Sequence, residues 1–327
     1  MKVPAQRKFG NSGIEVPPLC LGGNVFGWTA DERTSFKLLD GLLAADFNFI
    51  DTADVYSRWA PGHHGGESET ILGKWMKQRG NRQHVILATK CGMEMSPDKK
   101  GLARAYILRA AEDSLRRLQT EYIDLYQAHQ DDPTTPLEET LAAFAQLIQQ
   151  GKVRAIGASN YTVSRLAEAL RISEQNGMPR YESLQPWYNL ADRNKFEGEL
   201  EALCLREKLG VITYYSLARG FLTGKYRSQN DLGQSPRGKG VAGYLNERGM
   251  KILSALDEIA REYYSTPARV ALAWLMARPS VTAAIASATS LDQLTDLIES
   301  TRLDLTPPTL ALLDQASAVE AEPTAAA

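Results

Sequence analysis

The sequence predicts an α/β protein folded as a (β/α)8 TIM barrel, with an N-terminal β-hairpin before the barrel and two extra C-terminal helices after it. Two observations carry this prediction. Eight short apolar runs with strand character alternate with amphipathic segments of helical length, as in parallel β-α units. No long linker or shift in composition divides the 327 residues, which favours one closed barrel over an open doubly wound sheet.

The predicted elements follow in a regular order. A turn at residues 11–13 lies between two short extended pieces within 7–16 and predicts the hairpin. We expect barrel strands at 18–23, 47–51, 84–90, 122–128, 153–158, 182–185, 210–215 and 282–286. We expect helices at 31–45, 67–79, 104–118, 137–150, 162–176, 195–208, 247–277 (broken near Thr266 and Pro267), 290–299 and 307–318.

The whole barrel is expected to be one domain. It covers residues 1–318, and 319–327 are expected to form a disordered tail. Three connections, 52–66, 91–103 and 224–246, are longer than barrel closure requires. Because each follows a strand, each belongs at the C-terminal face of the barrel, where such folds carry their chemistry.

Composition and charge argue against several classes of function. The 37 basic and 39 acidic residues give a formal charge of −2, which provides no field to gather nucleic acid. No apolar run approaches the ~18 residues of a membrane span, and the N-terminus lacks the apolar core of a signal peptide. The three cysteines lack metal-ligand spacing, so we expect no metal site and reduced thiols in a cytoplasmic protein.

Four polar residues follow apolar, strand-like runs and predict the catalytic site. Asp51, Lys90 and His129 end three successive predicted strands at equal spacings of 39 residues, and Tyr56 follows Asp51 by five. Each residue alone has an ordinary structural explanation, such as a cap, a surface lysine or a core histidine. Together they occupy equivalent strand ends, which converge in a barrel. We therefore expect the four side chains to form one site.

The chemistry of these four side chains suits proton delivery to a carbonyl oxygen. A free tyrosine has a pKa of about 10, and a nearby ammonium such as Lys90 favours the phenolate. Asp51 can keep the lysine charged and oriented. His129 can polarise the carbonyl, and Tyr56 can act as the general acid.

Reduction of a carbonyl also requires a hydride source, which predicts a nicotinamide or a flavin. Residues Ser159, Asn160 and Gln185 follow two later strands and can hydrogen-bond a carboxamide, while Tyr215 can stack on a flat ring. The loop at 216–225 contains small residues, glycines and a lysine, and can wrap a pyrophosphate. It matches neither a P-loop nor the G-x-G-x-x-G fingerprint, so we expect a non-Rossmann mode of binding.

Aromatic and methionine side chains near the predicted loop mouths are candidates for a substrate pocket. They are Trp28, Trp59, Met93 and Trp187. Packing at the barrel rim is an equally good explanation of the same pattern. The adjacent His63 and His64 lack metal-pair spacing and indicate a solvated loop.

The chain resembles the aldo-keto reductase family, in its bacterial and potassium-channel β-subunit-like branch, over nearly its whole length. The resemblance rests on residues 48–56, 88–90, 123–129, 151–160 and 185–189. It implies that Asp51, Tyr56, Lys90 and His129 are a catalytic tetrad. It also implies cofactor contacts for Ser159, Asn160, Gln185, Tyr215, Leu217, Gly220, Leu222, Gly224 and Lys225, and Ser216 at the start of the same loop is a further candidate contact.

One segment departs from the family pattern. This branch often carries an arginine and an asparagine after the last strand to hold the adenosine 2′-phosphate, whereas this chain has Ser287, Thr289 and Gln293. A 2′-phosphate prefers a charged partner, so its discrimination should be weaker than usual. We expect NADP(H) to be favoured and NAD(H) to be possible, with Asp292 as the residue that would favour NAD(H).

The leading hypothesis is a nicotinamide-dependent reductase or dehydrogenase that acts on a small-molecule carbonyl or alcohol, such as an aldehyde, a ketone or a sugar-like substrate. A nucleotide-binding regulatory module of the channel β-subunit kind is the alternative. A Schiff-base enzyme using Lys90 is a third, although such a lysine should be neutral. The physiological substrate, the favoured direction and the oligomeric state stay open.

Overall fold

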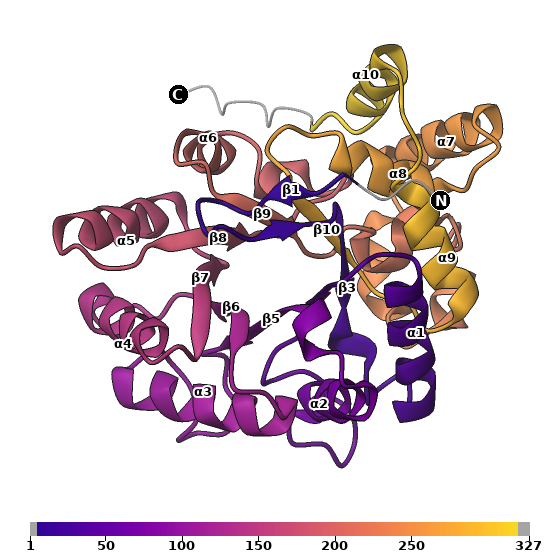
Figure 1. Cartoon of the computed structure of the whole chain (residues 1–327). Helices are drawn as coiled ribbons and strands as arrows, with labels where there is room; N and C mark the ends of the chain where they lie inside the picture. The colour runs from indigo at the N-terminus through magenta and orange to yellow at the C-terminus, as the bar shows by residue number, and fades with distance from the viewer. Residues whose placement is uncertain (1–4, 320–327) are drawn as a thin grey trace.

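The predicted barrel is confirmed by a computed structural model, which describes residues 5–319. The parallel strands close into a ring in chain order, and the last pairs with the first (Figure 1). These strands are β3 (Leu19–Gly22), β4 (Phe49–Asp51), β5 (Ile86–Cys91), β6 (Ile123–Ala128), β7 (Val153–Ser159), β8 (Tyr181–Gln185), β9 (Gly210–Thr213) and β10 (Ala283–Ala286). All of their C-terminal ends therefore face one side.

The helices surround this ring, as Figure 1 shows. They are α1 (Glu32–Ala44), α2 (Glu67–Arg79), α3 (Arg104–Leu118), α4 (Leu137–Gln149), α5 (Val163–Gln175), α6 (Glu199–Arg206), α7 (Glu247–Glu262), α8 (Pro267–Met276), α9 (Leu291–Ser300) and α10 (Pro307–Ala316). Both predicted closing helices are present. The first, α9, packs between α8 and α1 and completes the ring, whereas α10 packs against α7.

Two helix boundaries have clear local causes. The predicted break near residue 266 separates α7 from α8, because Thr266 caps the new helix by accepting from Arg269 N and Pro267 occupies its first turn. The helix predicted from residue 195 begins only at Glu199. Gly198 has φ 100° and ψ −131°, which an α-helix does not accommodate.

The N-terminal hairpin covers the end of the barrel opposite the strand C-termini. Its strands β1 (Arg7–Lys8) and β2 (Glu15–Val16) pair antiparallel. Phe9 inserts among the inward-facing strand residues and meets Phe49 edge to face, with ring centroids 5.9 Å apart. Gly210 is required there, because a Cβ at that position would lie 2.8 Å from the Phe9 ring. In the described part of the chain, the hairpin therefore covers this end, and we expect a ligand at the opposite end.

Two expectations concern the ends of the chain and membranes. The predicted tail comprises residues 319–327, and all of it beyond residue 319 lies outside the described residues. Within residues 5–319, no helix is long and apolar enough to cross a membrane.

Candidate active site

The structure brings the four predicted catalytic residues together at the strand C-terminal ends. Asp51 ends β4, Lys90 lies near the end of β5, His129 directly follows β6, and Tyr56 lies in the loop after β4. Lys90 Nζ lies 2.6 Å from Asp51 Oδ2 and 2.9 Å from the Tyr56 hydroxyl. The rings of Tyr56 and His129 meet edge to face, with centroids 5.9 Å apart. The convergence predicted from strand order is therefore present.

The buried ammonium of Lys90 uses all of its donors. Besides Asp51 and Tyr56, Lys90 Nζ donates to the Thr52 backbone oxygen at 2.7 Å. A lysine has three ammonium protons, so no donor is left over. These contacts fit a charged lysine held in place, and they do not fit the neutral, free amine that Schiff-base chemistry requires.

The second oxygen of Asp51 is held by a layer of glutamines that sequence analysis missed in part. Gln185 Nε2 donates to Asp51 Oδ1 at 2.9 Å and to Gln127 Oε1 at 3.3 Å, and Gln127 Nε2 lies 3.4 Å from Asp51 Oδ1. Gln127 pairs in register with Lys90. Its one signal in the sequence is a polar residue in a strand of mainly apolar residues, which Asp124 shows as well. The Gln185 amide nitrogen is thus already used, which leaves its oxygen for a ligand.

Burial sets the protonation of the two groups that would face a carbonyl. Burial, and then the nearby Asp51 carboxylate, raise the pKa of the Tyr56 hydroxyl well above its ordinary value. This differs from the expectation that Lys90 would favour the phenolate, because desolvation outweighs the cation. Burial, assisted by Lys90, lowers the pKa of His129 well below its ordinary value. Tyr56 therefore keeps its proton near neutral pH, and His129 is neutral.

The residues predicted to hold a carboxamide form one hydrogen-bonded group. Ser159 Oγ donates to the Gln185 backbone oxygen at 2.9 Å, and Asn160 Nδ2 donates to Ser159 Oγ and to the His129 backbone oxygen. The Tyr214 hydroxyl donates to Asn160 Oδ1 at 2.7 Å. Tyr214 was missed by sequence analysis, because two adjacent tyrosines leave open which one faces this group. The role of Ser159, Asn160 and Gln185 as cofactor ligands stays a prediction.

The predicted nucleotide loop follows β9 and contains the turn η4 (Ala218–Thr223). Gly220 and Gly224 have φ of 101° and 79°, in the left-handed region that favours glycine. Leu222 is buried in the core, which leaves only its backbone for a ligand. Ser216 Oγ is turned inward and donates to the Thr213 backbone oxygen.

The other members of this loop lie closer to its surface. Leu217 packs half-buried against the core, whereas Lys225 is exposed beside Gly220. The ring of Tyr215 meets Trp187 at a centroid distance of 5.1 Å. The glycines, the lysine and the flat ring fit a dinucleotide phosphate and a nicotinamide.

The polar side chains of the segment after β10 bond to one another and to the residues that follow β3. Gln293 Oε1 accepts from both the backbone N and the hydroxyl of Thr289, at 2.8 and 3.1 Å. The Ser287 hydroxyl donates to Asn24 Oδ1 at 2.5 Å. Asn24, which follows β3, is a further polar residue at this spot that strand order alone did not bring to notice. The groups are polar and uncharged, as expected from the sequence.

The predicted pocket residues form two aromatic walls. Trp28 meets Trp59, and Trp59 meets Tyr56, at centroid distances of 5.6 and 6.0 Å. Trp187 lies against Tyr215 in a second group of rings, and the half-buried Met93 lies in the loop after β5. Three of the four therefore contact a predicted catalytic or cofactor residue directly or through one ring.

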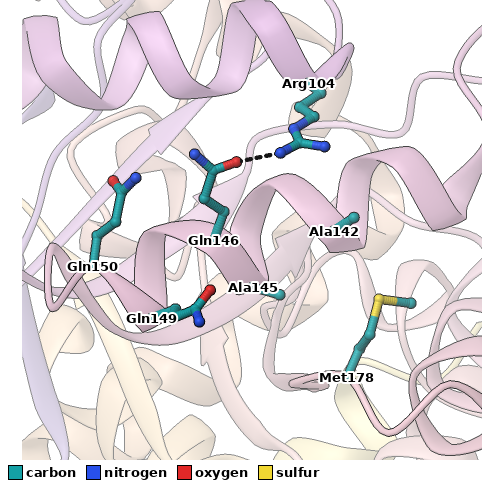
Figure 2. Close-up of a pocket in the computed structure, with 7 residues that line it drawn as sticks. All are labelled: Arg104, Ala142, Ala145, Gln146, Gln149, Gln150 and Met178. Carbon is teal, nitrogen blue, oxygen red and sulfur yellow. Dashed lines mark hydrogen bonds between the residues drawn. The ribbon is translucent and has the colours of Figure 1, made fainter.

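A pocket of about 490 Å³ lies elsewhere, on the outer helices (Figure 2). Its lining is Arg104, Ala142, Ala145, Gln146, Gln149, Gln150 and Met178. Figure 2 shows Arg104 donating to Gln146, so its one charged group is already engaged. It contains no predicted site residue.

Comparison with known proteins identifies the family to which this chain belongs. A model of the aldo/keto reductase family matches residues 18–318. The chain is 35% identical over 314 residues to the uncharacterized oxidoreductase YrpG of Bacillus subtilis, with 93% of each chain covered. It is 32% identical over 333 residues to protein tas of Escherichia coli, covering 93% of this chain and 95% of tas. A rice protein named "Probable voltage-gated potassium channel subunit beta" is 32% identical over 309 residues, covering 92% of each chain. The chain therefore belongs to the aldo/keto reductase family of oxidoreductases, which generally use NADP(H).

Proposed function

We propose that this oxidoreductase interconverts the carbonyl group of an aldehyde, ketone or sugar-like substrate and the corresponding alcohol, with Tyr56 as general acid and base. One observation carries the proposal. The Tyr56 hydroxyl lies between Lys90 Nζ at 2.9 Å and Asp51 Oδ2 at 3.2 Å, beside the neutral His129 ring. A proton donor flanked by a fixed cation and a second polar ring is the arrangement that acid catalysis at a carbonyl needs.

The side chains divide the work of proton transfer. Tyr56 donates its proton to the oxygen that gains charge during reduction. Lys90, held by Asp51, stabilises the tyrosinate that remains, because opposite charges attract strongly in a buried site. His129 orients the carbonyl by hydrogen bonding from its neutral ring. In the reverse direction, the tyrosinate accepts the proton of the alcohol.

When bound, a nicotinamide would supply the hydride for reduction or accept it in the reverse direction. The residues that would hold it are Ser159, Asn160 and Gln185 at the carboxamide, Tyr215 or Tyr214 at the ring, and the loop from Ser216 to Lys225 at the phosphates. We favour NADP(H), because Ser287, Thr289 and Gln293 form a polar, uncharged surface that repels no phosphate. NAD(H) is the second choice, since no cation lies among these three.

The alternative is a regulatory role with nucleotide bound and turnover incidental. The name of the rice relative favours it. The intact group around Tyr56 favours the enzyme, because regulation alone would not require a proton donor between Lys90 and Asp51.

A turnover assay separates these functions. Purified protein with NADPH and a simple aldehyde such as 4-nitrobenzaldehyde should consume nucleotide and aldehyde one to one. Nucleotide that binds tightly without any turnover across a panel of aldehydes and ketones would favour the regulatory role. Borohydride trapping of an aldehyde on Lys90 in the absence of nucleotide would favour the Schiff-base mechanism instead.

A further inference from the structure

Two arginines in the loops after β9, at the C-terminal face of the barrel, have no anionic partner. Arg219 lies in η4, and Arg237 directly precedes the turn η6 (Gly238–Tyr244). Within residues 5–319, neither guanidinium donates a hydrogen bond or forms an ion pair, and Arg237 Nη2 is buried. By contrast, Arg227, which lies with Arg237 in the long loop 224–246, has an anionic partner and forms a bidentate pair with Asp257. A buried guanidinium nitrogen without a partner is costly, so the unpaired Arg237 Nη2 calls for an explanation, whereas Arg219 is half-buried.

Both guanidinium groups lie over the aromatic walls of the mouth. The Arg237 Cζ lies 5.5 Å from the centroid of the Trp28 ring, which continues through Trp59 to Tyr56. The Arg219 Cζ lies 4.5 Å from the Tyr215 centroid and 5.5 Å from that of Trp187. The arginines therefore lie at the predicted nicotinamide and substrate end of the site, not at the segment after β10.

The long loop 224–246 holds one of these cations in place. A Cβ at Gly240 would lie 2.9 Å from Arg219 Nη1, so the loop backbone passes directly over the guanidinium. Arg219 is thereby enclosed between the loop and the Tyr215 and Trp187 rings. The Arg219 backbone has a φ of 58°, in the left-handed region that residues other than glycine rarely adopt. A cation held this firmly is preorganised for a ligand.

The charges around the mouth leave the two arginines uncompensated. Burial, and to a smaller extent the neighbouring Arg219, lower the pKa of Arg237, while the Tyr215, Tyr226 and Tyr56 hydroxyls act in the opposite direction. Two carboxylates of the site are already engaged: Asp51 pairs with Lys90. Asp192 accepts from Trp187 Nε1, Asn189 Nδ2 and the Tyr244 hydroxyl.

We propose that Arg219 and Arg237 bind an anionic group of the substrate, so that the preferred substrate class is an aldehyde or ketone that carries a carboxylate. This inference rests on the proposed carbonyl reduction. A planar guanidinium suits a carboxylate because it can donate two parallel hydrogen bonds, and the aromatic walls suit the apolar part of such a substrate. The phosphates of the dinucleotide are the other anion that this chemistry could take, and nucleotide titration separates the two.

The test compares 4-carboxybenzaldehyde with its neutral methyl ester, methyl 4-formylbenzoate, at saturating NADPH. The wild type should favour the carboxylate in kcat/KM by about ten- to a hundredfold, the range expected for a charge-assisted hydrogen bond. Arg237→Met and Arg219→Met should each remove most of this preference by raising KM for the carboxylate. The ester should change by less than about twofold.

Matched variants identify the cause of the change. Arg237→Lys retains the charge without the planar fork and should recover part of the preference. Lys239→Met removes an exposed cation two residues away and should leave the preference intact. Thermal melts of all variants identify any that fail to fold. Equal kcat/KM for the two aldehydes in the folded wild type would overturn the proposal and leave carbonyl reduction standing.

Nucleotide titration separates the two possible anions. If Arg219 and Arg237 bind the substrate, the Kd of NADPH should stay within about twofold in both methionine variants. A weakened Kd together with an equal loss for both aldehydes would assign the arginines to the dinucleotide and overturn the proposal. If neither aldehyde is turned over, the proposed function fails, and quenching of tryptophan fluorescence by benzoate still decides the question. Quenching lost in Arg237→Met supports the anion site, and no quenching in the wild type refutes it.

Discussion

Lys90 and Asp51, from neighbouring strands, form an ion pair of 2.6 Å with both side chains buried. Because the Lys90 ammonium also donates to Tyr56 and to the Thr52 backbone, one cation links the Tyr56 hydroxyl to the strand that carries Asp51. We therefore expect the ion pair to contribute both to the stability of the barrel and to the proposed proton transfer. Mutation can separate these two contributions.

Lys90→Met should abolish turnover and also destabilise the fold. Removing one partner of a buried pair leaves an uncompensated charge on Asp51, which typically costs about 3–5 kcal/mol. In the double variant with Asp51→Asn, the stability measured by urea unfolding should largely return, whereas the activity should not. Recovery of activity in the double variant would refute the electrostatic role of Lys90.

The rate of carbonyl reduction should be insensitive to pH across the neutral range. Burial raises the pKa of Tyr56 above about 10, so the proton donor stays loaded on the alkaline side. Burial lowers the pKa of His129, so the ring stays neutral on the acid side. A plot of kcat from pH 6 to about 9 should therefore be flat. A clear alkaline decrease with a midpoint near 8 would contradict this assignment of the Tyr56 proton.

Asp54 should make the fold less stable as the pH rises. Burial, followed by Glu69, raises the pKa of this carboxyl well above its ordinary value, and its Oδ1 has no partner in the described part of the chain. Between the ordinary carboxyl value and the raised one, the unfolded chain loses the proton first, which favours unfolding. Asp54→Asn removes this effect, so its Tm should exceed that of the wild type at pH 8 and converge with it at pH 4.

The exposed Asp98 is a control for which the pKa shift, and therefore the expected change in Tm, has the opposite sign. A hydrogen bond from Ser96 lowers the pKa of Asp98, so Asp98→Asn should slightly lower the Tm at pH 8. If Asp54→Asn lowers the Tm at pH 8 as well, the buried Asp54 carboxyl is charged and stabilising, and the raised pKa assigned to it is wrong.

Thr289→Arg should tighten NADPH binding and leave NADH nearly unchanged. The new guanidinium would add a charge-assisted contact to a 2′-phosphate, for which about one to two decades in affinity are expected. Thr295→Arg adds the same charge one turn into α9 and is the control. Fluorescence titration with both nucleotides provides the affinities. An equal gain for NADPH and NADH would mean that residue 289 does not face the 2′-position, and a wild type that prefers NADH would direct attention to Asp292.

The sequence was sufficient to place the predicted catalytic residues but not the groups that surround them. Asp51, Lys90 and His129 could be placed together because each ends a strand, and the ends of parallel strands converge. Gln127 could not, since its contact with Asp51 depends on barrel register. Arg237 is harder still, because a loop of more than twenty residues decides where its guanidinium lies.

The pKa of Tyr56 also could not be predicted correctly from the sequence. The sequence indicates that Lys90 is near Tyr56, and from proximity alone the tyrosine pKa should fall. The structure gives the opposite direction because the hydroxyl is desolvated and also faces Asp51. Proximity can be inferred from strand order, whereas burial is a property of the packed barrel.

The most direct test of the central claim is Tyr56→Phe, measured in a single turnover with NADPH and an aldehyde. The ring is kept and only the proton is lost, so the Kd of NADPH should stay within about twofold. Loss of one proton donor commonly lowers the rate by ~10²–10⁴-fold, and we expect nucleotide oxidation to slow by a factor in that range or larger. A folded Tyr56→Phe protein that oxidises NADPH at the wild-type rate would contradict the assignment of Tyr56 as the catalytic acid.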